Sequence, residues 1–386
     1  MARWWPPLLA LLLQRLLLSL VAVLSGLNPF APATWMRWDS GYYVNIANEG
    51  YTALGHCTPE THYPADTWCS SAGWFPGYPL LIHILGGSAG AALLLGAACQ
   101  LACLVLIWHL LRQPGGQNER RWHHWPALLL AAFFPGNVYM AAVFPAPVVS
   151  LAVLGCIALC LSGRFTAAAL AALIAAACYP TGVLLAPVVA VWALLHRRHR
   201  ALPVLLGSLI GYAAVLAFLQ QQTGRWDAYF LVQRKYGYHF GLPFDALFAR
   251  LKPLVNRRYR SPATFTTALQ TLLSTTLVIS ALTSTAFTVF APEPAAQAGA
   301  TSAGQSTPAA RKRDERTSLV LLCVGAFWLA PLVLGGNLSL YRAEALLLPV
   351  VLLVPSLPRP LQLTLLGTAL ALSAPMAALF FRASLV

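Results

Sequence analysis

Long apolar runs separated by polar loops constrain this chain more than any other feature. Hydrophobic residues make up 58% of its 386 residues and charged residues only 9%, whereas a soluble domain carries about 25% charged residues. The first run, 8–27, has the length of about 20 residues that a helix needs to cross a bilayer, and its strongly polar breaks are Gln14 and Arg15. It is too long for the core of a signal peptide, so we expect a retained helix. Residues 1–386 are therefore predicted to form one integral membrane domain, an all-α polytopic membrane protein.

Further apolar runs predict about 11 membrane spans in total. Clear runs lie near 88–111, 126–142, 147–162, 201–221, 263–290, 319–335, 340–355 and 361–381. The shorter run 77–86 predicts a helix at the membrane interface. Residues 165–195 allow two alternatives, because Pro180 and Gly182 break or kink a helix: two short helices that meet at the far face of the membrane, or one long kinked helix. The basic cluster at 196–200 favours two helices, since it then stays cytoplasmic.

The formal net charge of +14 follows the same pattern. Lys and Arg collect in cytoplasmic loops of membrane proteins, and the basic residues are scattered between apolar runs, which argues against a nucleic-acid partner. The composition of 291–318, with a basic end, predicts a disordered cytoplasmic linker. The loop 222–262 carries eight Lys and Arg residues. We expect it to be extracytoplasmic, with its charge directed at an anionic lipid-phosphate substrate.

Two of the eight cysteines differ from the rest in their surroundings. Six lie in apolar runs, where Cys acts as a small hydrophobic residue. Cys57 and Cys69 instead flank a polar loop. If this loop faces an oxidising compartment, the two are expected to form a disulfide.

Asp39 is the candidate for chemistry, because the chain has only 11 acidic residues and this one follows the first apolar run. It lies in the loop 28–76, which we expect to be the first extracytoplasmic loop. The structural alternative is a turn residue, since Asp39-Ser40-Gly41 suits a turn.

Three motifs occur in this loop in a fixed order. They are Trp38-Asp39, then Ile46-Ala47-Asn48-Glu49-Gly50-Tyr51, then Trp74-Phe75-Pro76-Gly77-Tyr78-Pro79. This order resembles the phosphatidylinositol-glycan class V (PIG-V) mannosyltransferases, whose first luminal loop has a Trp-Asp pair, an Ile-Ala-x-x-Gly-Tyr segment and a Phe-Phe-Pro-Gly-Phe/Tyr-Pro segment. A weaker match over 222–237 resembles an extracytoplasmic loop of bacterial relatives. The chain departs from the family at Tyr179, near which the family often has Arg, and the insert 56–69 is not a family feature.

The resemblance implies a GT-C-like helical bundle whose extracytoplasmic loops form the active site of a glycosyltransferase. Such enzymes transfer a hexose, mannose in this family, from a polyprenyl-phosphate donor with inversion. Asp39 would be the general base, because an acceptor hydroxyl is a poor nucleophile until a base takes its proton. Arg37 would hold Asp39 and favour its ionised form. The departing lipid phosphate needs cations, which Arg234 and Lys235, or Arg342, would supply.

The resemblance also implies a set of substrate-binding residues, in which aromatic rings stack on sugars or lie at the interface. The expected set is Arg37, Trp38, Tyr42, Tyr43, Glu49, Tyr51, Trp74, Gln233, Arg234, Lys235 and Arg342. For Glu49 a helix-surface charge is the alternative, and Arg342 could instead extend to the interface beside Glu344. No cofactor is expected besides the lipid-linked donor, and no pair of acids with ligand spacing indicates a metal. Expected partners are a glycolipid, glycan or protein acceptor and membrane lipids.

Two other functions compete with this one. A transporter or flippase of a lipid-linked or anionic solute would suit the polytopic layout. It predicts charged or polar residues within spans, of which the sequence has few, and half-chain repeats, which are not detected. A non-catalytic subunit with the same fold is the other. The Ala, Leu and Arg content favours a bacterial plasma membrane with an extracytoplasmic site, or the endoplasmic reticulum in a eukaryote.

Overall fold

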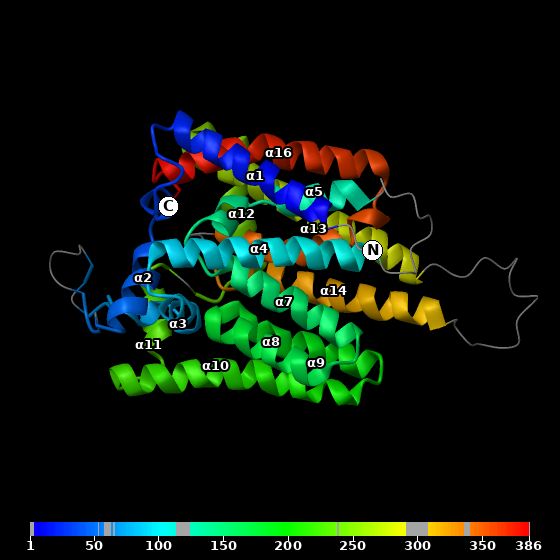
Figure 1. Cartoon of the computed structure of the whole chain (residues 1–386), viewed down its shortest axis with the longest axis horizontal. Helices are drawn as coiled ribbons and strands as arrows, with labels where there is room; N and C mark the ends of the chain where they lie inside the picture. Colours follow the sequence, from blue (N-terminus) through cyan, green and yellow to red (C-terminus); the bar gives the residue numbers. More distant parts are fainter. Residues whose placement is uncertain are drawn as a thin grey trace, which may run out of the picture.

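The computed structural model describes residues 4–52, 54–57, 63–64, 66–112, 124–237, 239–290, 308–335 and 340–385, and every regular element in this part is a helix. This confirms the predicted all-α class. The helices are α1 (Trp5–Leu24), α2 (Ser40–Glu49), α3 (Gly77–Ile84), α4 (Ala89–Leu111), α5 (Trp125–Ala132), α6 (Asn137–Ala141), α7 (Ala146–Leu161), α8 (Phe165–Cys178), α9 (Leu185–Leu195), α10 (Leu202–Thr223), α11 (Ala228–Arg234), α12 (Pro243–Val255), α13 (Pro262–Phe290), α14 (Pro308–Val333), α15 (Leu340–Ala343) and α16 (Arg359–Phe381). The long helices lie side by side in one bundle (Figure 1).

Six helices in the described part are long and apolar enough to cross a membrane, namely α1, α4, α10, α13, α14 and α16. The chain is therefore an integral membrane protein, but the expected count of about 11 spans is not confirmed. Two of the expected spans are broken. The run 126–142 divides into α5 and α6 at Pro135 and Gly136, where Gly136 has φ +82. The run 340–355 contains Pro349 and forms mainly a 3-10 helix, η9 (Glu344–Leu352).

The segment 165–195 forms two short helices, which is the first of the two alternatives. α8 ends at Cys178, the 3-10 helix η5 (Pro180–Leu184) follows, and α9 returns to the other end of the bundle. Gly182 makes this reversal possible, because a Cβ there would lie 2.2 Å from the backbone of Ala175. α8 and α10 then run in the same direction, with Gly207 of α10 against Ala169.

The polar residues of the first span are used to hold the bundle together. Arg15 donates to Oε1 of Gln100 at 2.8 Å and to the carbonyl of Ala141 at 3.2 Å. Gln14 donates to the carbonyl of Asn137 at 3.2 Å. Buried polar groups need such partners, so α1 is tied to α4 and to the end of the broken α5–α6 segment.

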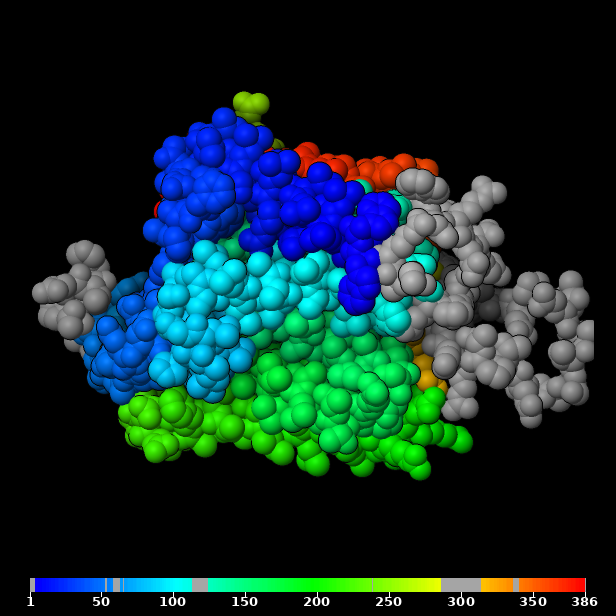
Figure 2. Space-filling view, in the orientation of Figure 1, coloured from blue at the N-terminus to red at the C-terminus, as the bar shows by residue number. Residues whose placement is uncertain are grey.

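The bundle has two distinct ends. One end, which we name the Asp39 end, carries α2, α3, α11 and the C-terminus (Figure 1). In the space-filling view, residues of the first loop cover this end beside α4 and the N-terminal part of the chain (Figure 2). The opposite end carries the basic cluster 196–200 and the start of α14. Helix α14 begins at Pro308, so residues 308–318 of the predicted disordered linker are helical, while 291–307 lies outside the described residues.

Candidate active site

Asp39 is the residue before the first turn of α2, but its carboxylate does not cap the helix. Ser40 serves the turn instead, since its Oγ accepts from the Arg37 N–H at 3.2 Å. The preceding Trp38 has φ +48, a left-handed conformation that costs free energy in a bulky residue. Strain of this kind persists where the surrounding structure holds it, and functional sites are where it clusters.

The carboxylate of Asp39 is paired with Arg342, which lies 303 positions further along the chain. Nη1 of Arg342 donates to Oδ2 of Asp39. The side chain of Arg342 is 14% exposed and that of Asp39 is 29% exposed, so the cation is the more deeply buried partner. The guanidinium also lies 5.5 Å from the ring centre of Trp38, 5.7 Å from Tyr139 and 5.5 Å from Phe144, which are cation–π distances. The carboxylate thus keeps access to solvent beside a fixed cation.

The expected partner of Asp39 was its neighbour Arg37, and the structure corrects this. Arg37 donates to the carbonyl of Phe381 through Nε at 3.3 Å and Nη2 at 3.1 Å. Its Nη1 donates to the carbonyls of Ala33 and Met36. Arg37 therefore fixes the loop to the end of α16, because unpaired carbonyls at a helix end attract such donors.

The second loop reaches the same site through the residues that follow α11. Gln233, expected to bind substrate, instead donates to the carbonyl of Gly73 at 3.1 Å and so joins the two loops. Nζ of Lys235 lies 5.3 Å from the ring centre of Tyr63 and 4.7 Å from that of Tyr236. The same ammonium donates to Sγ of Cys69 at 3.7 Å.

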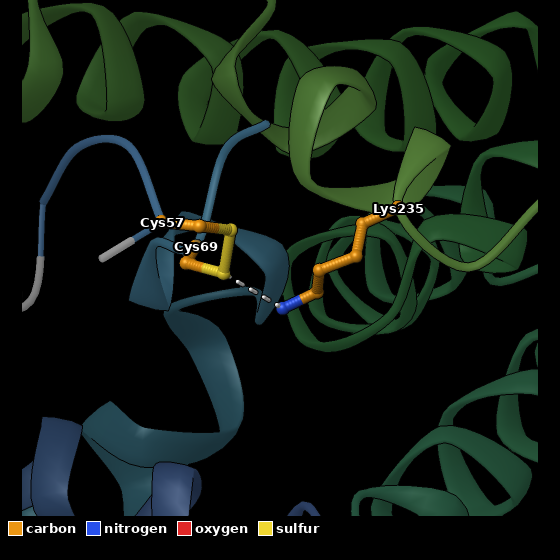
Figure 3. The surroundings of a disulfide bond; sticks show 3 residues. All are labelled: Cys57, Cys69 and Lys235. Carbon is orange, nitrogen blue, oxygen red and sulfur yellow. Dashed lines mark hydrogen bonds between the residues drawn. A yellow bond between two sulfur atoms is a disulfide. The ribbon is translucent and has the colours of Figure 1, made fainter. Parts of the chain in front are cut away.

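Cys57 and Cys69 form the predicted disulfide. In Figure 3 the disulfide lies beside the loop that carries Lys235, whose side chain extends toward Sγ of Cys69. Tyr63 and Cys69 of the insert therefore contact the second loop at Lys235.

Electrostatic effects of Asp39 identify which side chains share its surroundings. Burial, and then the negative charge of Asp39, raise the pKa of the Tyr42 hydroxyl and that of the Tyr236 hydroxyl. Burial lowers the pKa of Lys235, against the opposing effect of Asp39. Desolvation and a nearby carboxylate act in these directions. Asp39, Arg342, Lys235, Tyr42 and Tyr236 thus form one cluster, contributed by three distant parts of the chain.

The aromatic residues of the predicted motifs divide into exposed and structural members. Tyr42 is exposed and stacks on Trp74, with ring centres 3.7 Å apart. Tyr51 is buried, and its hydroxyl donates to the carbonyl of Trp74 at 2.5 Å. Tyr43 is buried against Tyr78. Of these, Tyr42 has the exposed ring that can stack on a ligand.

Two predicted residues lie away from the cluster. Glu49 is exposed at the end of α2, which matches the alternative of a surface charge. Arg234 is exposed, and its positive charge acts on Asp227. No group of three or more His, Cys, Asp or Glu that could hold a metal occurs among the described residues.

Sequence reasoning missed Gln270, a buried residue of α13 that supports Arg342. Its Nε2 donates to the carbonyl of Tyr341 at 3.0 Å and to Oε2 of Glu344 at 2.7 Å. Its Oε1 accepts from the N–H of Gly136 at 3.2 Å. The signal in the sequence was an amide side chain within an apolar run. A polar group that is buried with such a run needs hydrogen-bond partners.

The sequence matches no protein-family model and no curated protein. Among solved structures, it is similar to the crystal structure of the Archaeoglobus fulgidus oligosaccharyltransferase tethered with an acceptor peptide containing the NVT sequon via a disulfide bond. The TM-score is 0.46 at 13% identity, over 99% of this chain and 55% of that chain. The present chain thus spans about half the length of that enzyme. Likeness at this level assigns neither family nor activity.

Proposed function

We propose that this chain is a membrane glycosyltransferase of GT-C type. It transfers a hexose, mannose by its resemblance to the PIG-V family, from a polyprenyl-phosphate donor to an acceptor outside the cytoplasm. Asp39 is the general base, and the anomeric carbon is inverted because one displacement occurs. The acceptor is a glycolipid, a glycan or a protein.

The observation that carries the proposal is the pairing of Asp39 with Arg342 at one end of the bundle. A base for the acceptor hydroxyl and a cation for the departing phosphate are the two groups that the reaction needs. Both are present in this one ion pair, and Lys235 adds a second cation on which the charge of Asp39 acts. Asp39, Lys235 and Arg342 all lie in segments where the resemblance to the PIG-V family implies contacts with the substrate.

The chemistry follows from these positions. The acceptor hydroxyl gives its proton to the carboxylate of Asp39 as its oxygen attacks the anomeric carbon. The bond from that carbon to the phosphate oxygen breaks at the same time, and the electron pair stays on the phosphate. Arg342 and Lys235 stabilise the negative charge on the leaving phosphate, which therefore needs no proton from an acid. The exposed ring of Tyr42 supports a sugar ring by stacking.

The transporter alternative has less support. Two small cavities lie among the described helices, one beside Glu344 and Trp328 and one beside Asn137 and Gln270. Each has space for about one water molecule, so neither of these two cavities can hold a solute.

The test is sugar transfer by the purified protein from radiolabelled polyprenyl-phosphate-mannose in mixed micelles, with membrane extract as the acceptor source. Wild type, Asp39→Asn and Glu49→Gln are compared at equal amounts of folded protein. We expect Asp39→Asn to lose at least about 100-fold in rate, as for removal of a general base. Glu49→Gln, an exposed acid on the same helix, keeps wild-type activity.

Full activity in Asp39→Asn contradicts the assigned base. Binding of the donor by wild type without any transfer or hydrolysis supports the transporter or the non-catalytic subunit instead.

A further inference from the structure

The segment 240–260 carries a surface that the proposed reaction does not use. It contains α12 and the 3-10 helix η7 (Arg257–Tyr259). Five of its 21 residues are Lys or Arg and one, Asp245, is acidic. It also exposes several large apolar side chains, so both its charge and its apolar area need a partner.

The two faces of α12 have different surroundings. Ala246 and Leu247 are buried and pack in a small cluster with Leu332 and Leu340. On the other face, Phe244 is 62% exposed, Phe248 63% and Val255 86%. These three lie four and seven residues apart, which places them in one stripe along the helix. The stripe is left uncovered by the described part of the chain.

One cation lies within this stripe and two more lie beyond its end. Lys252 falls between Phe248 and Val255 in the same helical register, and its ammonium lies 5.8 Å from the ring centre of Tyr259. Arg257 and Arg258 come just after the end of α12 and are exposed. No ion pair between described residues involves any of these three cations.

The segment lies at the Asp39 end of the bundle. Its start is fixed to the end of α14, because the His239 N–H donates to the carbonyl of Leu334 at 3.2 Å and the Gly241 N–H to that of Val333 at 2.8 Å. It leads into the start of α13, and two turns into α13, Gln270 contacts the residue next to Arg342. The cations thus lie at the same end of the bundle as the site.

We propose that 240–260 is an interfacial anchor that binds the anionic phospholipids of the leaflet on the Asp39 side. Phe244, Phe248 and Val255 enter the outer acyl region, while Arg257 and Arg258 bind lipid phosphates. An apolar stripe with cations within it and beyond its end fits a leaflet of negative surface charge, and amphipathic helices with basic clusters bind such surfaces. This inference does not depend on the proposed reaction.

The test uses the full-length protein in vesicles of phosphatidylcholine and phosphatidylglycerol, with an NBD fluorophore on Phe248→Cys. Labelling is selective, because the six free cysteines are buried and Cys57 and Cys69 are paired. Quenching is measured with aqueous iodide and with lipids that carry a nitroxide on the acyl chain. The same label on Glu49→Cys is the water-exposed control.

We expect the label at position 248 to be quenched by the nitroxide lipids and protected from iodide, with the opposite result at position 49. Nitroxide phosphatidylglycerol should quench position 248 at least about twofold more than nitroxide phosphatidylcholine at equal mole fraction. Arg257→Gln with Arg258→Gln removes that preference. The matched pair Arg197→Gln and Arg200→Gln, exposed at the opposite end, leaves it unchanged.

Strong iodide quenching at position 248 overturns the anchor, as does protection from both quenchers, which would indicate a protein partner or a second copy of this chain. Equal quenching by the two lipids overturns the headgroup preference. A label on Val255→Cys repeats each comparison if Phe248→Cys folds poorly.

Discussion

The Asp39–Arg342 pair predicts an asymmetric double-mutant cycle on the free energy of unfolding. At a charge separation of about 4 Å and an effective dielectric constant near 20, two unit charges attract by about 4 kcal/mol. Desolvation offsets part of this, because the side chains keep only 14% and 29% of their exposure. We therefore expect a coupling energy of about 2 kcal/mol between the two side chains.

The two single substitutions should differ in cost. Asp39→Asn leaves the more buried charge, Arg342, unpaired and should cost about 3 kcal/mol. Arg342→Gln leaves the more exposed carboxylate, which water can solvate, and should cost about 1 kcal/mol. The double variant should then be more stable than the sum of the single effects predicts.

Unfolding by SDS in mixed micelles, followed by tryptophan fluorescence, measures all four proteins. The pair Arg225–Asp227, with an N–O distance of 2.8 Å and side chains 51% and 24% exposed, is the control and should show a weaker coupling, because water screens its exposed arginine. Additive effects at Asp39 and Arg342, within about 0.5 kcal/mol, would refute the reasoning that a desolvated ion pair holds the two segments together.

Three further predictions concern the packing around the site. Gly77→Ala should lower the free energy of unfolding by about 1–3 kcal/mol through overpacking, because a Cβ there would lie 2.6 Å from the backbone of α8. The control is Gly155→Ala, which has open space around it and should leave the unfolding midpoint unchanged or slightly higher. Gln270→Leu should cost about 3 kcal/mol, because three buried partners lose their hydrogen bonds. Gln270→Glu should not restore this stability in the same assay, because a carboxylate can still accept from the Gly136 N–H but cannot donate to the carbonyl of Tyr341 or to Glu344. Loss of the disulfide in Cys57→Ser with Cys69→Ser should lower the stability of the insert by about 2–3 kcal/mol, measured as faster chymotrypsin cleavage within it at an unchanged global midpoint.

The fold class and much of the site could be predicted from local patterns. Apolar runs of membrane-spanning length identified α1, α4 and α16, and the polar surroundings of Cys57 and Cys69 identified their disulfide. The two breaks at Pro135 and Pro349 carried a local signal as well, the same Pro signal that was recognised at Pro180–Gly182. The prediction of unbroken spans at these positions rested on the apolar composition of the two runs, which a single Pro hardly changes.

The partner of Asp39 could not be predicted in the same way. Arg37 is only two positions from Asp39 in sequence, but its side chain is directed to the carbonyl of Phe381, near the C-terminal residue of the sequence. Arg342 reaches Asp39 from a segment whose backbone is held by Gln270, which donates to the carbonyl of Tyr341. Such choices depend on which segments pack together, and residue spacing carries no information about contacts over more than 300 positions.

The pairing of a base with the cation that is proposed to bind phosphate has a consequence for ligand binding. A donor phosphate and the carboxylate of Asp39 would both be anions beside the guanidinium of Arg342, so the charge of Asp39 opposes the binding of the phosphate there. Removing the charge of Asp39 should therefore strengthen binding of polyprenyl phosphate, by about tenfold if this opposition is worth about 1.4 kcal/mol.

Binding of polyprenyl phosphate to wild type, Asp39→Asn and Arg342→Gln, measured by displacement of a fluorescent analogue in detergent, checks this. Arg342→Gln should weaken binding, whereas Asp39→Asn should strengthen it while abolishing transfer. Under this arrangement the donor phosphate draws Arg342 away from Asp39, and the carboxylate is then released to take the proton of the acceptor. Weaker binding in Asp39→Asn would show instead that the carboxylate positions Arg342 for the phosphate, and that the pair acts as one unit throughout the reaction.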